Sequence, residues 1–194
     1  MNPSLGPVGV LALQGDFHRH QQIVASLGVD SLQVRTREDL WGTSALVIPG
    51  GESTTIAMGV EREALAPEIS AYAAEGRPVF GTCAGMVLLS NSHLGLLDLD
   101  VERNAYGRQV HSFETDLTIA GVDGNPLRAL FIRAPMVTRV GDGVEVLAEL
   151  DGSAVMVRSG SVSAISFHPE LIGDSRVHEL ALGLSPSTSV QAAA

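Results

Sequence analysis

The apolar residues of the N-terminal part form one short run and then recur at helical spacing. The run over 8–13 is closed by Gln14-Gly15 and predicts a buried strand. The spacing beyond it predicts a helix that begins after Asp16, a capping residue, and ends near Gly28, a residue that commonly terminates helices. The chain therefore opens with a strand-turn-helix unit.

The same alternation of short apolar runs and helical stretches continues as far as residue 89. Strands are predicted over 31–34, 45–48 and 79–80, and helices over 65–75 and 86–89. This order favours a mostly parallel sheet covered by helices on both faces. Such sheets bind ligands at the carboxyl ends of their strands, where Gly15, the Pro49-Gly50-Gly51 turn and Cys83 fall.

Much of the second half alternates apolar and polar residues with a period of two, which predicts antiparallel strands. These strands are expected over 110–119, 129–132, 144–150, 154–157 and 162–167. Asp151-Gly152 is a hairpin signal between two of them, and Ser159-Gly160 predicts another turn. A last helix is predicted to begin at Asp174 or Ser175. The expected fold class is α/β, with three layers and a mixed, mostly parallel central sheet.

Length and composition limit the organisation of the chain. With 194 residues, one full domain is expected over 1–184, and the Ser-, Thr-, Pro- and Ala-rich tail over 185–194 is predicted to be disordered. No apolar run is long enough to cross a bilayer, so no membrane is expected as a partner. The N-terminus lacks the pattern of a signal peptide, which predicts a cytoplasmic protein.

Charge narrows the class of partners. The chain carries 22 acidic side chains against 12 basic ones, all of them arginine, for a net charge of −10. Nucleic acid is therefore not expected as a partner, because phosphate binding requires a basic face.

The single cysteine, Cys83, cannot form an internal disulfide, and its sequence neighbours suggest reactivity. Gly81-Thr82-Cys83-Ala84-Gly85 lies between a predicted strand and a predicted helix, the position of a nucleophile elbow. A helix N-terminus favours the thiolate, which is the reactive form. The alternative is a buried structural cysteine, the usual fate of free cysteines, but the glycine spacing favours a nucleophile.

One of six histidines is placed to act as the base for this cysteine. His168 follows the predicted strand 162–167, at the same sheet edge as Cys83. Pro169 disfavours helix at His168 and is expected to keep the segment extended, with His168 and Glu170 on one side of the chain. A Cys83, His168 and Glu170 triad is therefore predicted, although a strand-end turn is the alternative. Solvated or packing roles are expected for the other histidines, at positions 18, 20, 93, 111 and 178.

Amide hydrolysis also needs donors for the developing oxyanion, each worth about 3 kcal/mol. The backbone N–H groups of Gly51, in the Gly-Gly turn, and Ala84, next to the nucleophile, are the candidates. An ordinary turn with Ser53 capping the next helix is compatible with this role. The turn lacks the Gly-Lys-Ser/Thr ending of a nucleotide-binding P-loop.

Seven segments complete the pattern. They are Leu11-Ala12-Leu13-Gln14-Gly15-Asp16, Pro49-Gly50-Gly51-Glu52-Ser53-Thr54-Thr55, Gly81-Thr82-Cys83-Ala84-Gly85-Met86, Arg103-Asn104-x-Tyr106-Gly107-Arg108-Gln109, Ser112-Phe113-Glu114, Phe131-Ile132-Arg133-Ala134-Pro135 and Phe167-His168-Pro169-Glu170-Leu171. From about residue 8 to 184, the chain resembles the class I glutamine amidotransferase family and, within it, the glutaminase subunits of pyridoxal 5'-phosphate synthase.

This resemblance implies a flavodoxin-like fold and a glutaminase that forms a thioester on Cys83 and releases L-glutamate and ammonia. The ammonia would pass to a barrel-shaped pyridoxal 5'-phosphate synthase subunit in a hetero-oligomer, and no metal or redox cofactor is implied. The resemblance assigns glutamine binding to Gly51, Glu52, Ser53, Arg103, Ile132 and Arg133.

Two departures from the family pattern concern partner docking more than chemistry. Arg19 stands where the family commonly has glutamate before the histidine of the first helix, and the segment between Gly85 and His93 is several residues shorter than usual. A glutaminase that serves another synthase, such as one of histidine biosynthesis, is the alternative function. A non-catalytic interaction subunit is the alternative of another class.

Overall fold

The structure, a computed structural model, describes residues 6–103 and 112–184. In chain order its elements are β1 (Val8–Leu11), α1 (Phe17–Ser26), β2 (Ser31–Val34), α2 (Arg37–Trp41), β3 (Ala45–Ile48), α3 (Ser53–Arg62), α4 (Leu65–Ala74), β4 (Val79–Thr82), α5 (Ala84–Leu89), β5 (Leu99–Glu102), β6 (Ser112–Leu117), β7 (Leu127–Ile132), β8 (Met136–Val140), β9 (Glu145–Leu150), β10 (Ser153–Ser159), β11 (Val162–Ile165), α6 (Pro169–Ile172) and α7 (Arg176–Leu182).

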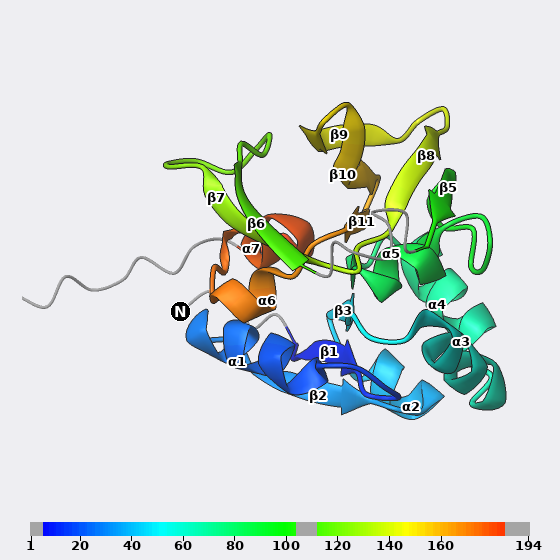
Figure 1. Ribbon diagram of the computed structural model, residues 1–194. Coiled ribbons are helices and arrows are strands. Elements are labelled where there is room, and N and C mark those ends of the chain that lie inside the picture. The colour runs from blue at the N-terminus through cyan, green and yellow to red at the C-terminus, as the bar shows by residue number, and fades with distance from the viewer. Residues whose placement is uncertain (1–5, 104–111, 185–194) are drawn as a thin grey trace, which may run out of the picture.

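Seven strands form the central sheet, in the order β2-β1-β3-β4-β11-β10-β9. The pairs from β2 to β11 are parallel, whereas β10 runs antiparallel to both β11 and β9. The pairs β5-β8 and β6-β7 form separate two-stranded sheets, which stand above β1, β2 and β3 in Figure 1. The predicted α/β class with a mixed, mostly parallel sheet is confirmed.

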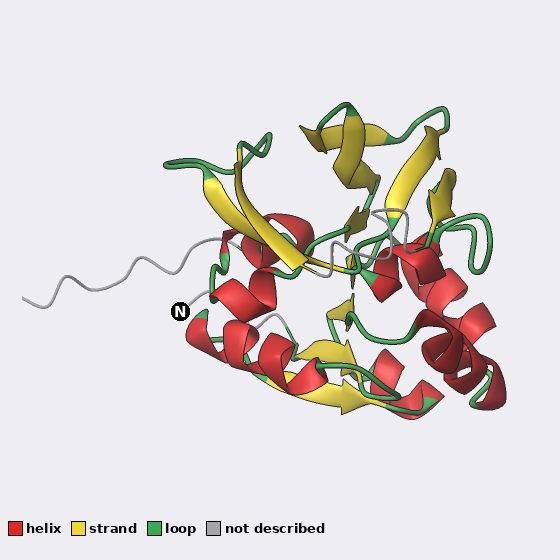
Figure 2. Cartoon of the chain, viewed as in Figure 1, coloured by secondary structure: helices red, strands yellow, loops and turns green. Residues whose placement is uncertain are grey.

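A separate core lies on each face of the sheet. On one face, Val10 of β1 and Phe80 of β4 pack with Val24 of α1 and Val177 of α7. On the other face, α2, α3, α4 and α5 contribute buried side chains, among them Ile56. Figure 2 shows these helices on the two sides of the strands, as predicted for a three-layer domain.

Several predicted elements have the predicted boundaries. β2 and β3 span 31–34 and 45–48, and the β9-β10 hairpin turns at Asp151 and Gly152, both at positive φ (50° and 78°). Positive φ at both central residues is the geometry of a type I′ turn, which explains why Asp-Gly signalled it. Besides α3, which was expected only as a helix after the Gly-Gly turn and without bounds, four short elements were not predicted: α2, β5, β8 and α6. Each has four or five residues, too short for a period to be read.

Of two expected helix caps, the first is at the expected position and the second is wrong. Asp16 occupies the N-cap position of α1, although its side chain makes no capping hydrogen bond. Ser53 is the first helical residue of α3, and Glu52 caps that helix by accepting hydrogen bonds from the backbone N–H groups of Thr54 and Thr55. Three predicted features lie outside the described residues: the tail 185–194, His111, and residues 104–109 of the segment that begins at Arg103. The single-domain boundary at 184 stays a prediction.

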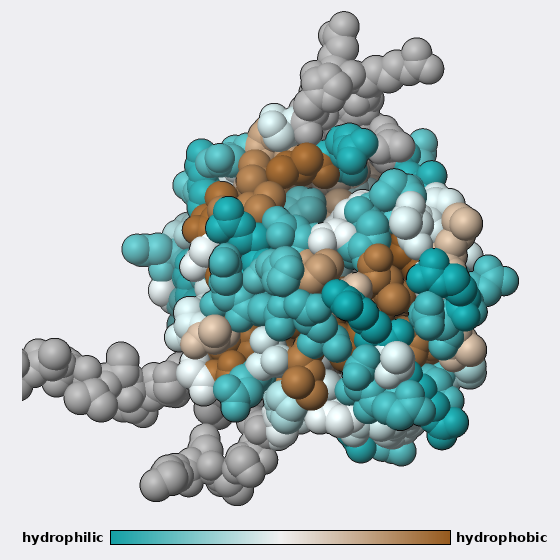
Figure 3. Space-filling view, turned by 90° about the horizontal axis from the view of Figure 1, so that it is seen from below, coloured by the Kyte–Doolittle hydropathy of each residue, from teal (hydrophilic) through white to brown (hydrophobic). Residues whose placement is uncertain are grey.

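The surface view in Figure 3 shows apolar areas separated by hydrophilic side chains. Among the described residues, no helix has the length and apolar character that crossing a bilayer requires.

Candidate active site

A cavity of about 220 Å³ opens at the carboxyl edge of the central sheet, beside the ends of β3, β4 and β7. It is lined by Gly51, Glu52, Ser53, Cys83, Ala84, Val87, Arg103, Ile132, Arg133, Pro135 and His168. Every predicted site residue except Glu170 is in this lining, and Glu170 is buried behind His168. The structure therefore brings together residues from five separate segments of the chain.

Cys83 lies at the sharp turn between β4 and α5. Its φ of 49° and ψ of −101° are unusual for a residue with a side chain and are typical of a strained nucleophile elbow. The turn requires Gly85, because a methyl group there would collide with the carbonyl oxygen of Ile48 in the neighbouring strand. The glycine thus serves the close approach of α5 to β3, and the thiol is directed into the cavity.

His168 lies just beyond β11 and is held by its backbone N–H, which donates to the carbonyl oxygen of Leu130 in β7 at 2.9 Å. Its Nδ1 lies 2.7 Å from Oε1 of Glu170. The prediction that this segment stays extended is wrong. Pro169 is the first residue of the short helix α6, and the first helical turn brings Glu170 back under the imidazole.

Opposing effects act on the charge of His168. Burial by itself lowers the pKa of the imidazole, but hydrogen bonds to Cys83 and Glu170 outweigh burial and raise the pKa to about 10. At neutral pH the ring therefore carries a proton on each nitrogen, with one N–H available to Glu170 and the other to Cys83.

The Gly50-Gly51 turn packs directly against these side chains. A Cβ on Gly50 would lie 2.5 Å from Cε1 of His168 and 3.4 Å from Cβ of Cys83, so only glycine fits there. Gly51 has a φ of 153°, and the following N–H, of Glu52, donates to Oε1 of Gln14 at 2.7 Å. Gln14, which the sequence did not single out individually, thus anchors the turn.

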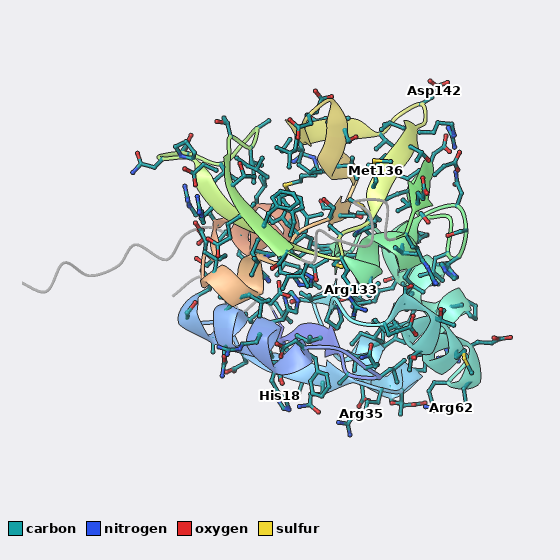
Figure 4. All side chains as sticks on the ribbon, in the orientation of Figure 1. His18, Arg35, Arg62, Arg133, Met136 and Asp142 are labelled. Carbon is teal, nitrogen blue, oxygen red and sulfur yellow. The ribbon has the colours of Figure 1, made fainter. Side chains whose placement is uncertain are left out.

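Two arginines reach the same cavity from different strands. Nη1 of Arg103 donates to the hydroxyl oxygens of Ser53 and Thr54 at 3.0 and 2.9 Å, at the first turn of α3. Arg133 follows β7 with a φ of 43°, and Figure 4 shows it in the interior of the view, whereas Arg62 lies at the periphery. The cavity lining therefore includes two arginines, a residue type suited to binding a ligand carboxylate.

The sequence left open whether two histidines are solvated or packed, and the structure buries both. His20 of α1 and His178 of α7 are fully buried, and His20 lies next to Glu170. The signal was present, because His20 precedes Ile23 and Val24 by three and four residues and so shares their buried helix face. In the described parts of the chain, no group of three His, Cys, Asp or Glu side chains is arranged to hold a metal ion.

Known proteins share this sequence and structure. A solved structure described as "Crystal structure of glutamine amidotransferase" is 47% identical, with a TM-score of 0.87 over 92% of this chain and 98% of the other. "Pyridoxal 5'-phosphate synthase subunit PdxT" of Pelotomaculum thermopropionicum is 52% identical over 178 residues, which cover 88% of this chain and 91% of the relative. The protein of the same name from Herpetosiphon aurantiacus is 50% identical over 91% of this chain and 99% of its own length.

The family match covers the whole cavity. Residues 10–183 match the SNO glutamine amidotransferase family, a span that includes every residue of the cavity lining and Glu170. The cysteine elbow and the buried histidine-glutamate pair agree with this match, which covers nearly the full length. The chain therefore belongs to the SNO glutamine amidotransferase family.

Proposed function

We propose that this chain is the glutaminase subunit of a pyridoxal 5'-phosphate synthase, which hydrolyses the side-chain amide of L-glutamine and delivers ammonia to a synthase subunit. One observation carries the reaction: Cys83 and His168 line one cavity, and Glu170 holds His168 from behind. The subunit assignment is supported by relatives of that name at 52% and 50% identity.

In the first half of the proposed reaction, the thiolate of Cys83 attacks the carbonyl carbon of the glutamine amide. The oxygen gains negative charge, which the N–H groups of Gly51 and Ala84 can stabilise. Ala84 is the first residue of α5, so its N–H belongs to the helix turn without intrahelical partners. His168 donates a proton to the amide nitrogen, the C–N bond breaks, ammonia leaves, and a thioester remains on Cys83.

In the second half, neutral His168 takes a proton from a water molecule, whose oxygen attacks the thioester carbon. The C–S bond breaks, glutamate is released, and the thiolate-imidazolium pair is restored. Glu170 keeps Nδ1 of His168 protonated through the 2.7 Å hydrogen bond, so that Nε2 exchanges the proton in both halves.

The proposed substrate contacts follow from the charges of free glutamine. Its α-carboxylate needs a fixed cation, and Arg103 and Arg133 reach the cavity. Its ammonium needs acceptors, which the carboxylate of Glu52, the hydroxyl of Ser53 and the backbone oxygen of Ile132 can provide. The side-chain amide then extends toward Cys83, with its carbonyl between Gly51 and Ala84.

A glutaminase assay with and without a pyridoxal 5'-phosphate synthase subunit tests this function. We expect Cys83→Ala to lose at least about 10³-fold in glutamate release. His93→Ala is the control, because His93 is exposed and outside the cavity, and it should retain wild-type activity.

Activity that survives in Cys83→Ala would contradict the nucleophile. A wild-type chain that hydrolyses glutamine but neither co-sediments with the synthase subunit nor supports its product formation would contradict the subunit assignment.

A further inference from the structure

A cluster of polar side chains is buried behind the candidate active site, where four elements meet. His20 of α1, Thr82 of β4 and His178 of α7 are fully buried, and Glu170 of α6 is 4% exposed. Thr82 directly precedes Cys83, and Glu170 contacts His168, so the cluster touches the reacting groups from the side opposite the cavity. The steps of the proposed reaction do not use His20 or His178.

The distances place His20 between His178 and Glu170. Its Nδ1 lies 2.9 Å from Nε2 of His178. Its Nε2 lies 3.2 Å from Oγ1 of Thr82 and 3.7 Å from Oε2 of Glu170. Oε1 of the same carboxylate contacts His168. The imidazoles of His20 and His168 therefore flank Glu170, one at each carboxylate oxygen.

The neighbours determine where the protons lie. Suppose that Nδ1 of His20 donated to His178. The unprotonated Nε2 of His20 would then face a carboxylate oxygen of Glu170. The N–H of His178 would lie on its Nδ1, buried without an acceptor among the described residues. In the reverse arrangement His178 donates from Nε2, and Nε2–H of His20 points at Thr82 and Glu170. That arrangement leaves only an acceptor lone pair unpaired on His178, which costs less.

The imidazole rings of His20 and His178 are both neutral at physiological pH. Burial, and next the neighbouring His178, hold the pKa of His20 well below its ordinary value. Burial lowers the pKa of His178 to about 3, although Asp174 acts in the opposite direction. Each ring therefore carries one N–H, and the chain of donors runs from His178 to His20 to Glu170.

We propose that His20 is a positioning residue of this active site: its Nε2–H faces Oε2 of Glu170 and holds the carboxylate so that Oε1 stays on Nδ1 of His168. This role rests on the proposed glutaminase function. Oε2 of Glu170 has no hydrogen-bond partner within 3.5 Å among the described residues, so the N–H of His20 at 3.7 Å is the donor that a small shift engages. A carboxylate free to rotate would release His168 from the geometry that proton transfer requires.

Two conservative substitutions separate positioning from packing. In His20→Gln the amide nitrogen takes the place of Nε2, facing Glu170, whereas in His20→Asn it takes the place of Nδ1, facing His178. Both variants bury a similar amide, so unfolding measurements should show comparable stability. We expect kcat for glutamine to fall less than about fivefold in His20→Gln and about 100-fold in His20→Asn, with KM unchanged because His20 is not in the cavity lining.

A double-mutant cycle then tests whether His20 acts through Glu170. In a Glu170→Gln background, His20→Asn should cause less than about threefold further loss of kcat, because the carboxylate that it positions is gone. Equal losses in the Gln and Asn variants, or a full additional loss in the Glu170→Gln background, would overturn the role of His20.

Alkylation of Cys83 by iodoacetamide distinguishes failure of this role from failure of the proposed function. Cys83 is the only cysteine of the chain, so the alkylation rate reports the thiolate fraction at one site. We expect the rate at neutral pH to fall about tenfold in His20→Asn and to remain near wild type in His20→Gln. If the wild type shows no glutaminase activity but this difference persists, the function fails and the positioning role stands. Identical rates in all three proteins overturn the positioning role.

Discussion

At the scale of single residues, backbone strain concentrates in the candidate site. In the described parts of the chain, four residues other than glycine have positive φ, and two of them, Cys83 and Arg133, line the cavity. Such conformations cost about 1–3 kcal/mol each and persist only where the surroundings enforce them. Both residues follow the end of a strand, β4 or β7, and both line the cavity.

Arg103 is the residue whose replacement best tests substrate binding. In Arg103→Met the hydrogen bonds to Ser53 and Thr54 and the positive charge are lost, while the aliphatic part of the side chain is kept. We expect KM for glutamine to rise about 10- to 100-fold, the value of a charge-assisted hydrogen bond, with kcat changed less than about threefold. Steady-state kinetics measure both, and Arg62→Met, at an exposed arginine outside the cavity, should leave both unchanged. An unchanged KM in Arg103→Met would remove Arg103 from the glutamine site.

At the scale of elements, the junction of β4 and α5 depends on close backbone packing. The start of α5 passes close to the carbonyl oxygen of Ile48 in β3, and this approach leaves no room for a side chain on Gly85. The order of strands makes this possible, since β4 lies between β3 and β11 and the loops after all three converge. The elbow, the Gly50-Gly51 turn and His168 therefore come from three adjacent strands.

Gly85→Ala and Gly59→Ala form a matched pair of helical glycine substitutions. The new methyl group meets the backbone oxygen of Ile48 in the first variant, but only the side chain of Leu13, at 3.2 Å, in the second. Because backbone cannot yield as a side chain can, we expect Gly85→Ala to lose about 1–3 kcal/mol in the free energy of unfolding, together with activity. Gly59→Ala should stay within about 1 kcal/mol of wild type, since helix propensity offsets the contact. Chemical denaturation measures both, and equal losses would contradict the backbone contact.

At the scale of the whole molecule, buried imidazoles join the two ends of the fold. His20 comes from the first helix and His178 from the last, and they meet above β4 with Nδ1 and Nε2 at 2.9 Å. His178 also packs edge-on against Phe80. The contact closes one face of the sheet and makes the packing of α1 and α7 sensitive to protonation.

Acid should destabilise the fold through His178. Its pKa is 6.5 in the unfolded chain and is lowered to about 3 by burial in the folded protein. Between these values the unfolded chain binds a proton that the folded chain does not, so the free energy of unfolding falls as pH is lowered from 6.5 toward 3. In His178→Leu the slope of the free energy of unfolding against pH should be smaller by about one proton. The folding equilibrium constant should therefore change about tenfold less per pH unit than in the wild type. Thermal unfolding at several pH values measures the slope. The control His93→Leu, at an exposed histidine, should keep the wild-type slope, and a wild-type slope in His178→Leu would contradict burial of a neutral ring.

The sequence by itself determined the local features of this protein. Short apolar runs and helical spacing predicted the strands β1 to β4 and the helices α1 and α4, because one-sided burial imposes a period on each element. The glycines around Cys83 predicted the turn after β4, and a side chain at Gly81 or Gly85 would collide with neighbouring backbone. The seven motif segments indicated the family.

Only the tertiary structure decided which residues from separate elements become neighbours. It brought the side chain of Arg103 into contact with the first turn of α3, Gln14 into contact with the Gly50-Gly51 turn, and His20 beside Glu170. It also showed that a helical turn after Pro169, and not an extended segment, brings Glu170 to His168. The physical reason is that a sequence period records how each element is buried, whereas contacts between elements depend on how those elements pack together.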